Sequence, residues 1–170
     1  MKKILGLGFI ILLMAGCLKS KENSVCGYTE SSLVAPQVES DSVQAYLDSN
    51  NLTATKHASG LYYSIINPGT GASINNLCTI LKVTYKGTLK NGTIFDAGSD
   101  TTAATFELGR VIPGWQKGLP LIKEAGRIIL YIPPSLAYGA TDIKENGVVV
   151  IPANSMLIFD INLLALSNTN

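Results

Sequence analysis

Few side chains in this sequence are of the types that carry covalent or metal chemistry. There is a single histidine, His57, and there are three cysteines, Cys17, Cys26 and Cys78. One histidine excludes every metal site that needs two imidazole ligands, and it leaves a Ser/His/Asp triad only one candidate base. The sequence has no P-loop and no GxGxxG segment, which are the usual cradles for nucleotide phosphates. We therefore expect neither a metal nor a cofactor.

Cys17 follows a leader with the form of a bacterial secretory signal. Two lysines and the apolar run 4–14 precede the small residues Ala15 and Gly16. The run is too short for a membrane span, which takes about 20 apolar residues. The stretch LMAGC resembles the lipobox of bacterial lipoproteins, which implies that residues 1–16 are removed and that Cys17 carries lipid. The protein is then anchored in the bacterial cell envelope, facing the periplasm or the exterior. An ordinary signal peptide with an incidental cysteine is the alternative.

The other two cysteines leave two interpretations open. In an oxidising compartment Cys26 and Cys78 could form a disulfide. We favour the alternative, in which Cys26 belongs to a flexible tether and Cys78 is a small apolar strand residue.

Charge and composition limit the classes of partner and divide the chain. The 13 basic and 12 acidic residues nearly balance, so we expect no nucleic-acid partner. The hydrophobic fraction of 46% is sufficient for a sizeable core.

Residues 17–39 are polar without periodicity and predict a lipid-anchored flexible tether. Residues 40–58 predict a helix and linker, and residues 59–166 predict the main domain.

The helix is expected at 41–50. Asp41 is suited to cap it, with Gln44 three residues later as in a capping box, and Val43, Tyr46 and Leu47 share one face.

Strand signals dominate from Gly60 onward, at 61–66, 79–89, 93–96, 105–108, 127–132 and 156–164. In the second of these, Leu81, Val83 and Tyr85 alternate with polar residues and form the expected core face. Asn91-Gly92 is a strong hairpin signal that pairs the second and third strands.

The period becomes helical between residues 112 and 126. Pro113 suits a first turn, Trp115, Leu119 and Ile122 fall at helical spacing, and Gly126 is the expected stop. One short helix among antiparallel strands predicts an α+β domain with the helix packed on the sheet.

Four blocks occur in one order: VTYKGTLKNGTIFDAG (83–98), TFELGRVIPGW (105–115), AGRIILYIPPSLAYGA (125–140) and VIPANSMLIFDINLL (150–164). Together they resemble the FKBP family of peptidyl-prolyl cis–trans isomerases. The resemblance implies a curved antiparallel sheet wrapped on one short helix, here preceded by a short N-terminal helix. It implies an isomerase that assists the folding of extracytoplasmic proteins without a cofactor or metal. Its partners would be proline-containing unfolded or partly folded polypeptides, with macrolides as inhibitors.

The resemblance also implies a site, in which Asp96, Tyr138 and Trp115 are catalytic. Substrate is bound by residues lining an aromatic pocket: Tyr85, Phe95, Phe106, Val111, Ile112, Ile151 and Phe159. Trp115 would be the floor, and the Ile112 N–H and the Tyr138 hydroxyl would bind substrate carbonyls. For several pocket residues, ordinary core packing is the alternative.

Three features depart from the family pattern. Ala104 stands where an aromatic residue is common, segment 139–150 is enlarged and charged, and Arg110 alone separates Gly109 from Val111. The missing aromatic favours an alternative function, a non-catalytic FKBP-like binding module or holdase chaperone.

Overall fold

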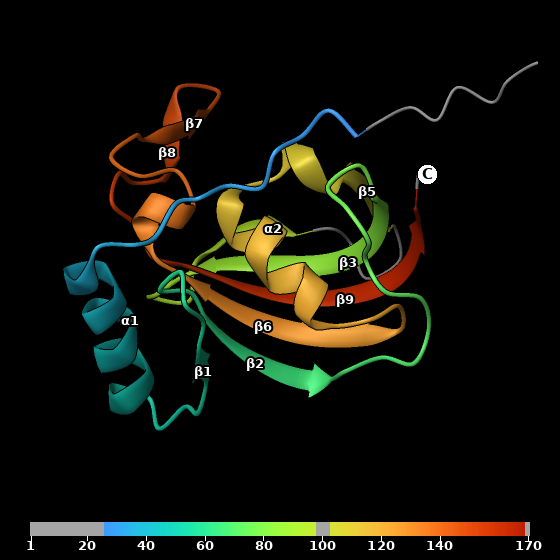
Figure 1. The fold of residues 1–170 in the computed structure, drawn as a ribbon. Coiled ribbons are helices and arrows are strands. Elements are labelled where there is room, and N and C mark those ends of the chain that lie inside the picture. Colours follow the sequence, from blue (N-terminus) through green and yellow to red (C-terminus); the bar gives the residue numbers. More distant parts are fainter. Residues whose placement is uncertain (1–25, 98–102, 169–170) are drawn as a thin grey trace, which may run out of the picture.

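A curved antiparallel sheet forms the centre of the structure, a computed structural model that describes residues 26–97 and 103–168 (Figure 1). Its strands are β1 (Thr55–Lys56), β2 (Tyr62–Asn67), β3 (Ile80–Leu89), β4 (Ile94–Ala97), β5 (Ala104–Glu107), β6 (Gly126–Ile132) and β9 (Leu157–Ser167). They lie in the order β1-β2-β6-β9-β3-β4, and β5 also pairs with β3. The predicted α+β architecture is confirmed, and the predicted strand ends differ from the observed ones by at most three residues.

Alternation along the central strands decides which side chains form the core. In β3, Leu81 and Val83 are fully buried, while Lys82 and Lys86 are exposed. The hairpin predicted at Asn91-Gly92 is present, because β3 pairs with β4. Since Gly92 has a φ of 84°, this turn uses a conformation that glycine adopts without strain.

The helix on the sheet is α2 (Pro113–Gly118), followed by the 3-10 turn η2 (Leu119–Leu121). Pro113 occupies the first turn as predicted, and Trp115 is buried. The helix ends well before the predicted stop at Gly126. The reason is Pro120, which has no N–H to donate and whose ring obstructs the carbonyl four residues earlier.

A second helix, α1 (Gln37–Ser49), packs beside one end of the sheet, while α2 lies across its face (Figure 1). It begins four residues before the predicted start, with Pro36 at its N-cap. The prediction that Asp41 caps the helix is wrong, because its carboxylate instead accepts a hydrogen bond from the side chain of Gln37 at 2.6 Å. The predicted apolar face is confirmed, since Val43 and Leu47 are buried in a cluster with Tyr62, Tyr131 and Met156.

Residues 26–36, which we call the strap, lie against the domain. Cys26 and Cys78 form a disulfide with their Cα atoms 5.6 Å apart, which corrects the interpretation that we favoured from the sequence. At the other end of the strap, Ala35 is buried and its N–H donates to the Ser59 carbonyl at 2.8 Å. The predicted tether therefore ends earlier than residue 39. Cys17 and the leader lie outside the described residues.

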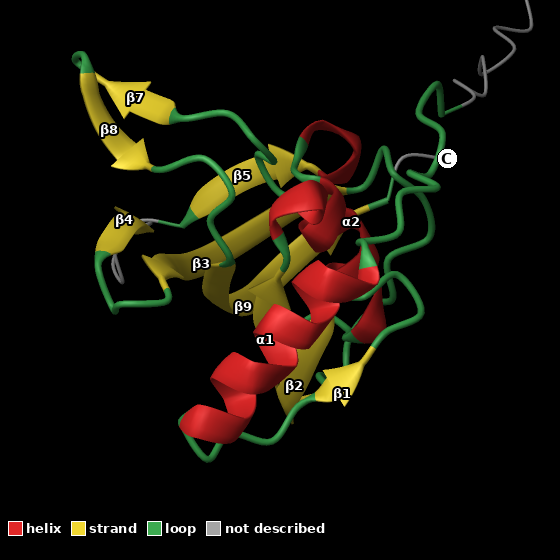
Figure 2. Cartoon of the chain, turned by 90° about the vertical axis from the view of Figure 1, so that its left-hand side faces the viewer, coloured by secondary structure: helices red, strands yellow, loops and turns green. Residues whose placement is uncertain are grey.

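Segment 139–150 contains a hairpin that the sequence analysis did not predict. Strands β7 (Ile143–Glu145) and β8 (Val148–Ile151) pair with each other and project from the sheet (Figure 2). The intervening Asn146 and Gly147 both have positive φ, of 49° and 82°. Asn-Gly is the same hairpin signal as at residues 91–92, so the sequence did contain the information. None of the helices in the described part of the chain has the length and apolarity needed to span a bilayer.

The burial of Leu47 makes α1 an integral part of the domain, and this generates a stability prediction. Leu47 is 1% exposed, whereas Val38 on the same helix is 74% exposed. We expect Leu47→Ala to lower the free energy of unfolding in urea by about 2–5 kcal/mol, because it leaves a cavity. Val38→Ala, the matched control, should change it by less than about 0.5 kcal/mol. Equal stability of the two variants would mean that α1 does not pack as described.

Candidate functional site

Five aromatic rings, which we call the aromatic cup, gather between α2 and the sheet: Tyr85, Phe95, Phe106, Trp115 and Phe159. Trp115 is at the centre, with its ring centroid 5.3 Å from that of Tyr85, 5.7 Å from Phe106 and 5.2 Å from Phe159. The rings meet at 83° to 88°, the edge-to-face arrangement that aromatic quadrupoles favour. Strands β3, β5 and β9 each supply one of the three partners. The cup is thus assembled from segments far apart in the sequence.

Two glycines allow the cup to close. A Cβ at Gly87 would lie 2.7 Å from the Phe95 ring and 2.9 Å from the Phe159 ring, so both rings pack on the β3 backbone. A Cβ at Gly114 would lie 2.6 Å from Ile132, so the first turn of α2 rests directly on β6. A larger residue at Gly87 would collide with the Phe95 and Phe159 rings, and one at Gly114 would collide with Ile132 and separate α2 from β6.

The apolar residues predicted to bind substrate surround the cup. Ile151 is 4% exposed at the end of β8 and belongs to the same buried cluster as Trp115 and Phe159. Val111 and Ile112 pack against that cluster and are half-buried. The structure therefore brings the predicted pocket residues together, while their roles in binding stay predictions.

Polar groups occupy the rim of the cup. The Tyr85 hydroxyl donates a hydrogen bond to the exposed Asp96 carboxylate at 2.8 Å. Burial raises the pKa of Tyr85, and the hydrogen bond to Asp96 and its negative charge raise it further. Burial also raises the pKa of Tyr138, with a smaller contribution from Asp96. Both phenols therefore keep their protons at neutral pH and are able to donate hydrogen bonds.

Two donors at this rim are available to a ligand. Within the described residues, neither the Ile112 N–H nor the Tyr138 hydroxyl has a hydrogen-bond acceptor. Tyr138 is 40% exposed, and Ile112 directly precedes α2. A substrate carbonyl could accept a hydrogen bond from either group without displacing an internal partner.

The single histidine, the other side chain considered for catalysis, lies outside the aromatic cup. His57 lies between β1 and β2, where its Nδ1 is 2.8 Å from the Ser59 hydroxyl. Among residues 26–97 and 103–168, no cluster of His, Cys, Asp and Glu could hold a metal ion. The cup itself presents apolar rings and protonated phenols, which suit binding and desolvation.

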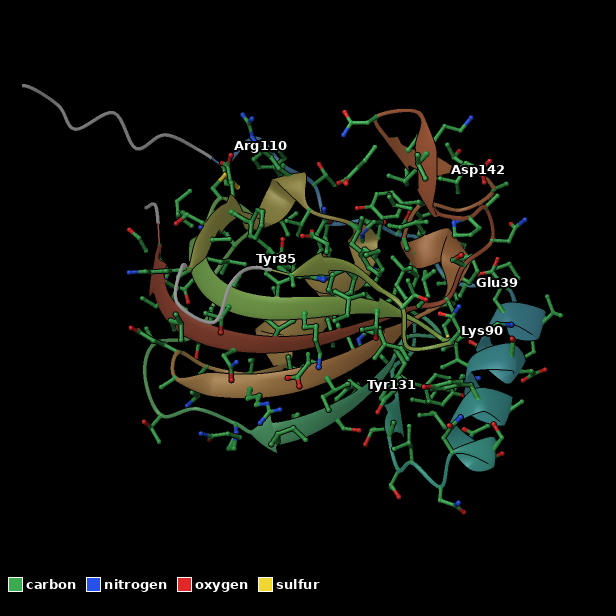
Figure 3. All side chains as sticks on the ribbon, turned by 180° about the vertical axis from the view of Figure 1, so that it is seen from behind. Glu39, Tyr85, Lys90, Arg110, Tyr131 and Asp142 are labelled. Atoms are coloured by element: carbon green, nitrogen blue, oxygen red, sulfur yellow. A yellow bond between two sulfur atoms is a disulfide. The ribbon has the colours of Figure 1, made fainter. Side chains whose placement is uncertain are left out.

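The departures noted in the sequence lie around the same site. Ala104 pairs with Val83 and lies two residues before Phe106 on β5, so this part of the wall has no ring. The β7–β8 hairpin leads into Ile151, and its valines Val148 and Val149 are exposed. A separate groove of about 800 Å³ lies between α1 and loop 152–156, with Glu39 and Lys90 among its lining residues (Figure 3).

The raised pKa of Tyr85 makes stability depend on pH in the alkaline range. Tyrosine in an unfolded chain titrates near pH 10, roughly, whereas folded Tyr85 keeps its proton to higher pH. Tyr85 contributes fully to the free energy of unfolding below about pH 10. Above about pH 10 the folded chain binds more protons than the unfolded chain, so the free energy of unfolding falls as the pH rises. We expect the free energy of unfolding in urea to decline above about pH 10, and to decline less steeply in Tyr85→Phe. An equally steep decline in that variant would contradict the assignment.

Comparison with known proteins identifies the family. Residues 73–164 match the family model described as FKBP-type peptidyl-prolyl cis-trans isomerase. The chain is 47% identical over 115 residues to the FKBP-type peptidyl-prolyl cis-trans isomerase FkpA of Buchnera aphidicola subsp. Schizaphis graminum. That match covers 67% of this chain and only 44% of the relative, so the chain spans less than half the length of this relative.

Solved structures agree with the sequence match. The crystal structure of FkpA from Escherichia coli has a TM-score of 0.66 at 34% identity, covering 79% of this chain and 62% of that one. A peptidyl-prolyl cis-trans isomerase from Pseudomonas syringae has a TM-score of 0.64 at 28% identity, covering 79% of this chain and 98% of that one. The family match covers more than half of the sequence, and the fold is shared with solved members. The chain therefore belongs to the family of FKBP-type peptidyl-prolyl cis–trans isomerases.

Proposed function

We propose that this protein is a peptidyl-prolyl cis–trans isomerase that assists the folding of proline-containing polypeptides outside the cytoplasm. The observation that carries the proposal is the buried Trp115 ring, enclosed by three rings and flanked by two unengaged hydrogen-bond donors. An X–Pro bond prefers trans by about 0.5–1 kcal/mol, but a barrier of about 18–20 kcal/mol separates the isomers. A catalyst needs only to favour the twisted amide, so no bond has to form to the protein.

The cup favours the twisted amide by excluding water from it. The planar amide is the more polar form because resonance separates charge between oxygen and nitrogen, and water stabilises that form. In the cup, the proline ring would rest on Trp115 among apolar walls, where this stabilisation is removed. The aromatic surfaces also give the ring a shaped binding site, which limits it to a few orientations.

The rim groups have separate roles in this mechanism. The Ile112 N–H and the Tyr138 hydroxyl each donate to a substrate carbonyl and so hold the chain on either side of the twisting bond. Tyr138 is suited to this because its raised pKa keeps it protonated. Asp96 accepts the Tyr85 hydroxyl bond and orients that ring, and it places a carboxylate at the edge of the cup. No group has to change its protonation state during the reaction.

A second function is favoured by one observation, the absence of a ring at Ala104. A non-catalytic binding module or holdase would keep the cup but grip segments of client chains without accelerating isomerisation. An aromatic contact contributes about 0.5–1.5 kcal/mol beyond simple burial, and a tenfold rate change corresponds to about 1.4 kcal/mol. A single missing ring should slow turnover rather than abolish it, so we favour the enzyme.

The same aromatic cup would also accept macrolide inhibitors.

We also propose that the protein is anchored in the bacterial cell envelope by lipid on Cys17. Support comes from the leader, in which a basic start and an apolar run precede Ala15, Gly16 and Cys17. The Cys26–Cys78 disulfide adds independent support, because structural disulfides persist mainly in oxidising compartments. Several acyl chains on one cysteine give stable membrane attachment, where one chain would be marginal.

Replacing Tyr138 with Phe tests the mechanism. One hydrogen bond contributes about 0.5–1.5 kcal/mol, so Tyr138→Phe should lower kcat/KM for a Leu-Pro peptide by roughly two- to tenfold. The measurement is a protease-free isomerisation assay on the purified full chain in detergent. His57→Ala is the control and should leave the rate unchanged, as should a chelator. If the wild type gives no acceleration over the uncatalysed reaction, the binding module replaces the enzyme as the function.

Replacing Cys17 with Ala tests the anchor. The variant should move from the membrane fraction to the soluble fraction and should no longer incorporate a fatty-acid analogue, because the thiol that accepts the lipid is gone. Cys26→Ser is the matched control and should remain membrane-bound and labelled. Firm membrane attachment of the Cys17→Ala protein would show that the lipobox interpretation is wrong.

A further inference from the structure

The strap, residues 26–36, lies outside the region that matches the family model and yet contacts the segment that carries Ile112. In Figure 1 it runs past η1 and α2 on its way to α1. The 3-10 turn η1 (Leu108–Arg110) lies between β5 and α2 in the chain. Segment 108–112 contains η1 and ends at Ile112, and Trp115 follows three residues later in α2. The position of the Ile112 N–H and of the Trp115 ring therefore depends on what holds 108–112.

The disulfide fastens the strap beside the backbone bonds of this segment. Cys78 lies between Leu77 and Thr79 in the sequence. The Thr79 carbonyl accepts from the Leu108 N–H at 3.0 Å, and the Leu77 carbonyl accepts from the Gly109 N–H at 2.6 Å. The bond from Cys26 to Cys78 thus ties the strap to the residues that hold η1 in place.

Tyr28 covers the outer side of the same turn. Its ring packs on Gly109 so closely that a Cβ there would collide with it. Its hydroxyl donates to the Glu107 carboxylate at 3.1 Å and accepts from Arg110 Nε at 2.9 Å. Arg110 Nε also lies 2.9 Å from Glu107, so the three side chains form one cluster, and Figure 3 shows Arg110 beside the start of the described chain.

Gln116 of α2 holds the segment from the other direction. Its side-chain amide donates to the Val111 carbonyl at 2.8 Å and to the Gly109 carbonyl at 3.4 Å. Further along the strap, the Lys117 ammonium donates to the Ser31 carbonyl, which joins the strap to α2 as well. Segment 108–112 therefore has the Tyr28 ring on Gly109 and the Gln116 amide on the Gly109 and Val111 carbonyls, in addition to its backbone bonds to residues 77 and 79.

We propose that the strap holds segment 108–112 in its substrate-binding geometry, with Tyr28 as a positioning residue for the Ile112 N–H and the disulfide as the fastening. The proposal rests on the proposed function, because it assigns the strap to the same cup. A donor loop gains binding strength when a surrounding shell keeps it in one conformation before substrate arrives. Without the strap, substrate binding would have to order the segment first.

Amide exchange and substrate binding test the proposal on the full chain. In Tyr28→Ala, the Leu108 and Gly109 amide protons should exchange at least about tenfold faster, because opening of η1 is no longer restrained. KM for a Leu-Pro peptide should rise roughly three- to tenfold while kcat changes less than about twofold. Tyr28→Phe keeps the ring on Gly109, so its amide exchange and its KM should lie closer to the wild-type values than to those of Tyr28→Ala. A Cys26→Ser/Cys78→Ser double variant should change both measurements in the same direction as Tyr28→Ala.

Leu47→Ala is the control for general destabilisation, since Leu47 lies in the separate cluster beneath α1. It should leave the KM at its wild-type value and should speed the Leu108 and Gly109 exchange less than Tyr28→Ala does. Wild-type exchange and KM in Tyr28→Ala would overturn the proposal, as would equal changes in Leu47→Ala. If the wild type proves inactive, the proposed function fails. The role of the strap is then still decided by comparing amide exchange, and the dissociation constant of the peptide from an NMR titration, between the wild type and Tyr28→Ala.

Discussion

The placement of the Trp115 ring is the constraint on which the rest of the structure depends. Its neighbours come from three strands and meet it nearly at right angles, so a small shift of the indole would lose contact on several sides at once. A short helix is sufficient to deliver one ring. Pro113 sets its first turn, and Gly114 lets the helix backbone rest on Ile132 of β6. The curvature of the sheet then brings the partner rings around the indole.

Around this apolar centre, the polar groups are arranged so that none of them needs to gain or lose a proton during the proposed reaction. Asp96 is charged, but its partner is the Tyr85 hydroxyl rather than a base that could take a proton. Burial raises the pKa of both Tyr85 and Tyr138, which keeps these phenols as neutral donors. A site of this kind is poorly suited to hydrolysis or group transfer. It is well suited to a reaction whose only change is rotation about one bond.

Periodicity predicted the part of the site that lies on regular strands. Alternation in β3 correctly placed Leu81 and Val83 in the core and Tyr85 on the same face. The β7–β8 hairpin was predictable from Asn146-Gly147, but the segment was interpreted only as an enlarged loop. The strap was not predictable in the same way. A disulfide and one ring packed on a glycine leave no repeating pattern in a polar segment, and their partners are distant in the sequence.

The strap also changes where a lipid anchor would act. With the proposed lipid on Cys17, the first described residue is Cys26, which the disulfide fixes to the domain, and a fully extended stretch of nine residues reaches at most about 30 Å. A tether extending to residue 39 would more than double that reach. Because Cys26 is fastened beside η1, the described chain begins on the side of the domain where the Ile112 segment lies. A lipid on Cys17 would then keep the cup within a limited distance of the bilayer. One disulfide would thus set both the working distance from the membrane and the shape of the binding segment.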